Sequence, residues 1–116
     1  MEQLMLPMLT VYSGPRLVSA EVLAGVLTYR EAVRSCWQLR TRRQLTQRAL
    51  AEEAGLYASH LSDYMAPEGD GRRELPARHI AAFEVACGNR LVTQWLTARA
   101  GLTVLEQFIP AARRVA

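Results

Sequence analysis

Side chains that form hydrogen bonds crowd one short stretch of the chain, YASHLSD at residues 57–63. Nucleophilic catalysis by serine or histidine needs a base held against the nucleophile and a third group that orients the base. The sequence shows no Ser–His–Asp arrangement of this kind, no phosphate-binding loop and no paired carboxylates, so we expect no enzymatic activity. The stretch instead indicates a surface that recognises a polar partner.

Arginine carries all the positive charge, because the sequence contains no lysine; 14 arginines face 11 acidic residues, a net charge of +3. Residues 28–48 hold six arginines against Glu31 alone, a local excess of five charges. The guanidinium fork matches phosphate oxygens, so this cluster indicates a polyanionic partner. A GC-rich genome and a solvated basic face are the alternatives. The six are Arg30, Arg34, Arg40, Arg42, Arg43 and Arg48.

Apolar residues at steps of three and four predict helices throughout, and no stretch alternates as a strand would. Ser19, Thr46 and Asn89 are the expected N-caps, Thr28 and Glu31 form a capping-box pattern, and glycines end several helices. In the helix after Thr28, Arg30 and Arg34 are expected on the face opposite the buried stripe. We predict an all-α fold, a compact bundle of five to six short helices. Its expected segments are 19–40 (one helix or two), 46–54, 58–65, 75–87, 89–101 and 103–108.

The length suits one domain. We expect an apolar N-terminal arm at 1–18, a helical domain at 19–109 and a frayed tail at 110–116. The chain lacks a membrane-length apolar run and a basic leader, so a cytoplasmic location is expected. Cys36 and Cys87 are expected to be buried thiols, and His60 and His79, the only histidines, offer no metal-ligand spacing. We expect no metal or cofactor, and the sequence neither predicts nor excludes a small-molecule effector.

Two of these helices, 46–54 and 58–65, are separated by a turn that contains Gly55, as in a helix-turn-helix. Ala51 is expected where the two helices approach closely, Leu56 fills their angle and Leu61 anchors the second helix. The remaining residues of the second helix face outward. The major groove of DNA admits such a helix and presents a distinct hydrogen-bonding pattern for each base pair. The predicted base-contacting residues are Tyr57, Ala58, Ser59, His60, Ser62 and Asp63.

The motif residues resemble the Cro/C1-type (XRE-like) helix-turn-helix of phage and plasmid repressors. The matching residues are Thr46-Gln47, Leu50-Ala51, Ala54-Gly55-Leu56 and Ser59-His60-Leu61-Ser62. Residues 75–102 are similar, more weakly, to the downstream helices of phage CII-like regulatory proteins. The resemblance implies that Gln47 contacts a phosphate and that Ala58, Ser59 and Ser62 reach bases. Many relatives carry Gln or Arg where this chain has Ala58 and Ser59, so DNA shape or arginines outside the helix are expected to add specificity.

The arginines before and after the motif are expected to meet the DNA backbone. With Gln47, the predicted phosphate contacts are Arg40, Arg42, Arg43, Arg48, Arg72 and Arg73. Two residues keep alternatives: His60 is either a base contact or an ordinary surface histidine. Asp63 either accepts a hydrogen bond from a cytosine amino group or pairs with a nearby arginine.

The sequence therefore favours a sequence-specific, DNA-binding transcriptional regulator, a repressor that binds a palindromic operator as a homodimer. The dimer surface is expected either around Trp95, Leu102, Leu105 and Phe108 or on the apolar N-terminal arm. The alternative is an antitoxin-like or adaptor module that keeps this fold but binds a protein. The position of Arg72 and Arg73 discriminates between them: beside the second motif helix for DNA, away from it for the alternative.

Overall fold

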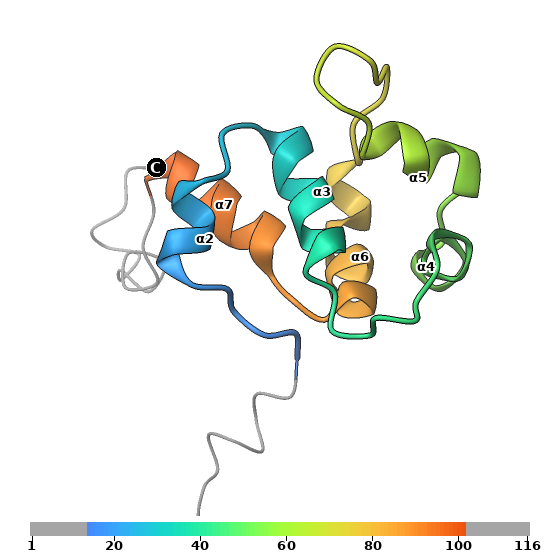
Figure 1. Cartoon of the computed structure of the whole chain (residues 1–116), viewed down its shortest axis with the longest axis horizontal. Coiled ribbons are helices and arrows are strands. Elements are labelled where there is room, and N and C mark those ends of the chain that lie inside the picture. Colours follow the sequence, from blue (N-terminus) through green and yellow to red (C-terminus); the bar gives the residue numbers. More distant parts are fainter. Residues whose placement is uncertain (1–13, 102–116) are drawn as a thin grey trace, which may run out of the picture.

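The computed structural model describes residues 14–101, which form six α-helices and one short 3-10 helix (Figure 1). Within this range the only extended pairing is an isolated bridge between Arg16 and Asn89, so the predicted all-α bundle is confirmed. The predicted helix at 103–108 and the tail lie outside the described residues, as does most of the N-terminal arm. In chain order the elements are α2 (Ala20–Ala24), α3 (Tyr29–Gln38), α4 (Gln47–Ala54), α5 (Ala58–Tyr64), η2 (Ala77–His79), α6 (Ile80–Cys87) and α7 (Leu91–Ala100).

The predicted side-chain caps begin three helices. The hydroxyls of Ser19, Thr28 and Thr46 each accept a hydrogen bond from the backbone N–H three residues later. Only half of the expected capping box forms, because the carboxylate of Glu31 accepts the N–H of Leu27, at 2.8 Å, rather than that of Thr28. The chain leaves the helical conformation between α2 and α3, so residues 19–40 form two helices.

Left-handed glycines end α4 and α6. Gly55 has φ of 74° and Gly88 has φ of 85°, a conformation that carries little strain only without a Cβ. Asn89 follows at once, and its side-chain oxygen accepts the N–H of Leu91 at 3.1 Å. The glycine and the asparagine together turn the chain from α6 into α7 within three residues.

The core lies where α3 packs on α7, and α4 packs on both α6 and α5. Its largest fully buried apolar side chains are Leu50, Leu61, Phe83 and Leu91. Each buried leucine or phenylalanine stabilises the fold by roughly 1.5–3 kcal/mol. Because the core holds α4 and α5 through their inner faces, their outer faces remain at the surface (Figure 1).

One expectation about burial is wrong, and one candidate dimer contact lies inside the chain. Trp95, a proposed dimer contact, is buried inside the chain, where its indole N–H donates to the carbonyl of Val26 at 2.9 Å. Arg30 is only 5% exposed rather than on the outer face.

Buried polar groups are compensated by specific partners. Glu84 is 1% exposed, and its carboxylate accepts the N–H and the hydroxyl of Thr93 in the first turn of α7. An anion is favourable there because the backbone N–H groups of a helix start point at it. Cys36 and Cys87 are free and buried, as predicted, and a hydrogen bond with Cys87 together with burial raises the pKa of Cys36. Between residues 14 and 101, no helix has the length and apolarity needed to cross a membrane.

Candidate nucleic-acid interface

Helices α4 and α5 are joined by the three-residue turn 55–57 and form a helix-turn-helix. The view in Figure 1 looks nearly along α4 while α5 lies across it, so the two helices cross steeply. Leu56 donates its N–H to the carbonyl of Ala51 at 2.7 Å, which closes the turn tightly. Ala51 is 2% exposed and Leu61 is fully buried, so both play the packing roles predicted for them.

The outer face of α5 consists mainly of small side chains with an aromatic residue at its start. Ala58, Ser59 and Ser62 are exposed, and Tyr57 is 73% exposed. His60 is half-buried and meets the Tyr57 ring edge-on, with ring centroids 5.1 Å apart. The helix therefore offers hydroxyls and an aromatic pair to a partner, and close approach of its backbone is possible because the other side chains are small.

Asp63 uses both carboxylate oxygens within the chain. Oδ1 accepts the backbone N–H of Arg72 at 2.9 Å, and Oδ2 accepts that of Arg73 at 3.0 Å. These hydrogen bonds, led by the one from Arg72, together with the charge of Arg73 lower the pKa of Asp63. Of the two alternatives for this residue, the structure contains the pairing with neighbouring arginines. A base contact through Asp63 stays a prediction that would have to compete with these bonds.

Arg30, in α3, binds both the end of α5 and the loop 66–74. Its guanidinium donates to the carbonyl of Asp63 and, at 2.7 Å, to the carbonyl of Arg73. Gly71 lies against this guanidinium so closely that a Cβ at that position would meet it and would come within 2.6 Å of the Asp63 carbonyl. Arg30 supplies donors to these two partly buried backbone carbonyls, and they in turn compensate the burial of its charge inside the fold.

A sequence signal for Arg30 existed and was missed. Arg30 precedes Val33 by three residues and Trp37 by seven, which is the spacing of a single helix face. The expectation that charge lies outward overrode this spacing. Its two partners, Asp63 in α5 and Arg73 in the loop, are more than 30 residues away in sequence, so no local pattern identifies them.

Two further contacts hold the loop 66–74 to the bundle. Thr28 donates its hydroxyl to Glu68 at 2.6 Å, and Tyr29 donates its hydroxyl to the carbonyl of Leu75 at 2.6 Å. Burial raises the pKa of Tyr29 to about 12, with smaller contributions from the negative charges of Glu74 and Glu84. The tyrosine therefore keeps its proton, and its hydrogen bond, at physiological pH.

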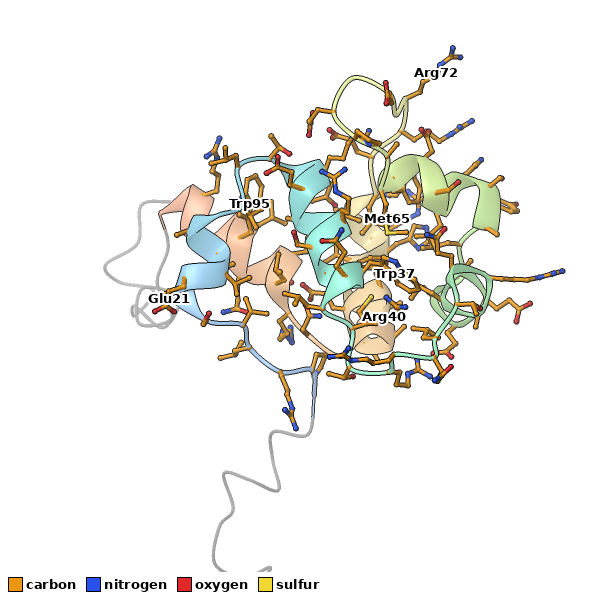
Figure 2. All side chains as sticks on the ribbon, in the orientation of Figure 1. Glu21, Trp37, Arg40, Met65, Arg72 and Trp95 are labelled. Carbon is orange, nitrogen blue, oxygen red and sulfur yellow. The ribbon has the colours of Figure 1, made fainter. Side chains whose placement is uncertain are left out.

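The backbone of the loop 66–74 is held by Arg30 and Asp63, and its two arginine side chains extend outside. Figure 2 shows Arg72 extending from the outer edge of the loop, away from the bundle. Arg73 lies 3.5 Å from Asp63 and its side chain is 55% exposed. At the start of α4, Gln47 and Arg48 are also exposed. The structure thus brings two predicted phosphate contacts next to α5 and presents two more on the neighbouring helix.

In the turn between α3 and α4, two of the three arginine side chains are bound to other residues of the chain. Arg40 stacks on the ring of Trp37 at 3.8 Å, and its three nitrogens donate to the carbonyls of Trp37, Arg43 and Leu45 (Figure 2). Arg42 forms a two-pronged pair with Glu53, at 2.7 and 3.2 Å, and also donates to the carbonyl of Ala86. Of the three predicted phosphate contacts in this turn, Arg43 alone donates no side-chain hydrogen bond to another described residue.

Comparison of the chain with protein-family models, with curated proteins and with solved structures finds no match in any of the three. The class of the protein therefore rests on its architecture, an all-α bundle that carries a helix-turn-helix. Over residues 14–101, no cluster of three or more histidine, cysteine or acidic side chains is arranged to hold a metal ion.

Proposed function

We propose that this protein is a sequence-specific DNA-binding regulator of transcription that reads the major groove with α5. The short, exposed and polar α5 is anchored by Leu61 and presents small side chains to a partner. The resemblance to Cro/C1-type repressors points to repression as the sign of regulation. Cro/C1-like proteins act on DNA inside the cell, so the proposed location is the cytoplasm.

The observation that carries the proposal is the attachment of the loop 66–74 to α5. Asp63, a residue of α5, accepts the backbone N–H groups of Arg72 and Arg73, so the loop and the helix form one surface. This is the side on which a DNA-binding protein needs positive charge, because phosphates flank the groove that the helix enters.

The proposed contacts fall into two groups according to their availability. Gln47, Arg43, Arg48, Arg72 and Arg73 are exposed and are proposed to bind phosphates. Arg40 and Arg42 donate most of their hydrogen bonds within the chain, so we expect little or no phosphate binding by them.

Base reading is proposed to use the hydroxyls of Ser59 and Ser62, the Tyr57–His60 pair and contact at Ala58. Small side chains give few specific hydrogen bonds, so the deformability of the DNA is expected to contribute much of the specificity.

We further propose a homodimer on a palindromic operator, because one seven-residue helix reads few base pairs. Trp95 is excluded from the dimer surface by its burial. The other proposed dimer contacts lie outside the described residues, apart from residues 14–18 of the N-terminal arm.

The test is selection from random-sequence duplex DNA, followed by affinity measurements over a salt series. We expect an enriched palindrome and a steep dependence of affinity on salt. The double variant Arg48→Ala/Arg72→Ala should reduce the log–log salt slope by about 1.8, since each lost phosphate contact removes about 0.9.

The matched control is Arg78→Ala/Arg99→Ala, which removes the same charge from exposed positions on η2 and α7. Equal losses in both double variants would mean that only overall charge matters. Absence of binding at low salt would overturn the proposal. A steep slope without an enriched sequence would reduce it to nonspecific DNA binding.

A further inference from the structure

A groove opens at the end of the bundle away from the loop 66–74. It lies between residues 14–16, the turn after α3 and the end of α6, and it is an open hollow with a volume of about 730 Å³. A second hollow of about 230 Å³ shares Leu39, Arg40 and Arg43 with it. The two hollows adjoin at these shared residues, which suits an extended occupant better than a compact one.

The groove is positively charged. Arg16, Arg40 and Arg43 line it, and none of the described residues that line it carries a carboxylate. Arg40 is held in place by Trp37 and three backbone carbonyls, so a ligand need not order it. An arginine has five N–H donors, and three are in use, which leaves two for a bound anion.

The same groove also exposes apolar side chains. Leu39 is 46% exposed and Val85 is 66% exposed, and both line the depression. A phosphate backbone would satisfy the arginines but would gain little from covering leucine and valine, because its own surface is charged. A polypeptide with carboxylates and apolar side chains would satisfy both features.

We propose that this groove docks an extended segment of a partner protein in which acidic residues alternate with apolar ones. The carboxylates bind Arg16, Arg40 and Arg43, and the apolar side chains cover Leu39 and Val85. This inference goes beyond DNA binding and does not depend on it. Arg43 is also a proposed phosphate contact, so it serves one partner at a time. The groove and the loop 66–74 lie at opposite ends of the bundle (Figure 1), so α5 and the other proposed DNA contacts stay clear of the partner protein.

The first test uses an array of short synthetic peptides built from Asp, Glu, Leu, Phe, Ser and Gly. The matched array replaces the acids with Lys and Arg. The full chain is expected to bind acidic, apolar peptides and to ignore the basic array. Peptides that bind are then titrated into isotopically labelled full chain, and the shifted backbone amides should be those of residues 14–16, 39–43 and 85–88.

Variants locate the site. Val85→Asp and Arg43→Glu should each weaken peptide binding by about tenfold or more, the effect of losing one well-covered contact. Both positions are at the surface, so the fold should tolerate the changes. Leu96→Asp is the control, because Leu96 is an exposed leucine on α7 that does not line the groove.

Four results would overturn the inference. The first is failure of every acidic peptide to bind, and the second is equal binding by the groove variants and the wild type. The third is a shift of the same amides by duplex DNA but not by peptides, which would assign the groove to phosphates. The fourth is a set of nuclear Overhauser contacts between Val85 and residues 1–13 in the free protein, which would mean that the chain covers its own groove.

Discussion

Two loops of this protein carry arginines, and they hold them in opposite ways. In the turn between α3 and α4, the side chains of Arg40 and Arg42 bind carbonyls, Trp37 and Glu53 of the same chain. In the loop 66–74, the backbone is held by Arg30 and Asp63, while the side chain of Arg72 extends outward. The arginine side chains of the first loop stabilise the structure of that loop, whereas the side chain of Arg72 in the second is available to a partner.

The difference shows that a cluster of arginines in a sequence is not the same as an available positive surface. The turn after α3 belongs to the denser cluster in sequence, yet two of its three arginines are engaged. The loop 66–74 even contains Glu68, Asp70 and Glu74, which outnumber its two arginines. The loop is proposed to take part in DNA binding because it is attached to α5, and amino-acid composition does not predict this attachment.

The largest expected effect comes from removing the buried guanidinium. Arg30→Met keeps a linear side chain but leaves the carbonyls of Asp63 and Arg73 without their donor. We expect a loss of about 2–4 kcal/mol in the free energy of unfolding, measured by urea denaturation. Arg34→Met is the control, since Arg34 makes only a long 3.5 Å contact with the carbonyl of Met65, and about 1 kcal/mol or less is expected. Equal losses would show that Arg30 does not organise the loop.

A smaller loss is expected from Gly71→Ala. The new methyl group would collide with the Arg30 guanidinium and with the Asp63 carbonyl, so the loop would have to move away from α5. Thermal denaturation should show about 1–3 kcal/mol of destabilisation. Gly25→Ala has its nearest neighbour at 3.7 Å and should stay within about 0.5 kcal/mol of the wild type. A Gly71→Ala protein as stable as the wild type would mean that the loop is held loosely.

The third prediction compares the two loops in DNA binding. Arg72→Ala should lower the log–log salt slope by about 0.9, because it removes one phosphate contact. Arg42→Ala/Glu53→Ala removes an ion pair without changing net charge, and the slope should not change. If the pair variant also lowers the slope, Arg42 leaves Glu53 to bind a phosphate, and the distinction between the loops fails.

The smallest effect concerns the pH dependence of loop attachment. The folded pKa of Asp63 is lowered, so its carboxylate stabilises the folded state above the unfolded pKa of about 4. This stabilisation is lost as the pH falls through the folded pKa. The backbone amide resonances of Arg72 and Arg73 should therefore shift with a midpoint below about 4, and Asp63→Asn should abolish the transition. A midpoint at or above the ordinary value would show that these hydrogen bonds do not favour the charged form.

Local sequence determined the helices and their ends. Ser19, Thr28 and Thr46 cap helices because a short hydroxyl side chain can reach the N–H three residues on, and Gly55 and Gly88 end them because they lack a Cβ. Periodicity also placed Leu50, Ala51 and Leu61 in the core. These features depend on neighbours within one or two turns, which is why pattern alone was sufficient.

Tertiary structure decided which charges are available. Arg30 is buried because a residue more than 30 positions away, Arg73, brings its carbonyl to the guanidinium. Asp63 holds the loop 66–74 to α5 because its carboxylate accepts the backbone N–H groups of Arg72 and Arg73. Trp95 is buried, and its indole N–H donates to the carbonyl of Val26, which lies 69 positions earlier. Hydrogen bonds across such separations follow from how the helices pack, and the energies that select the packing are shared by the whole core.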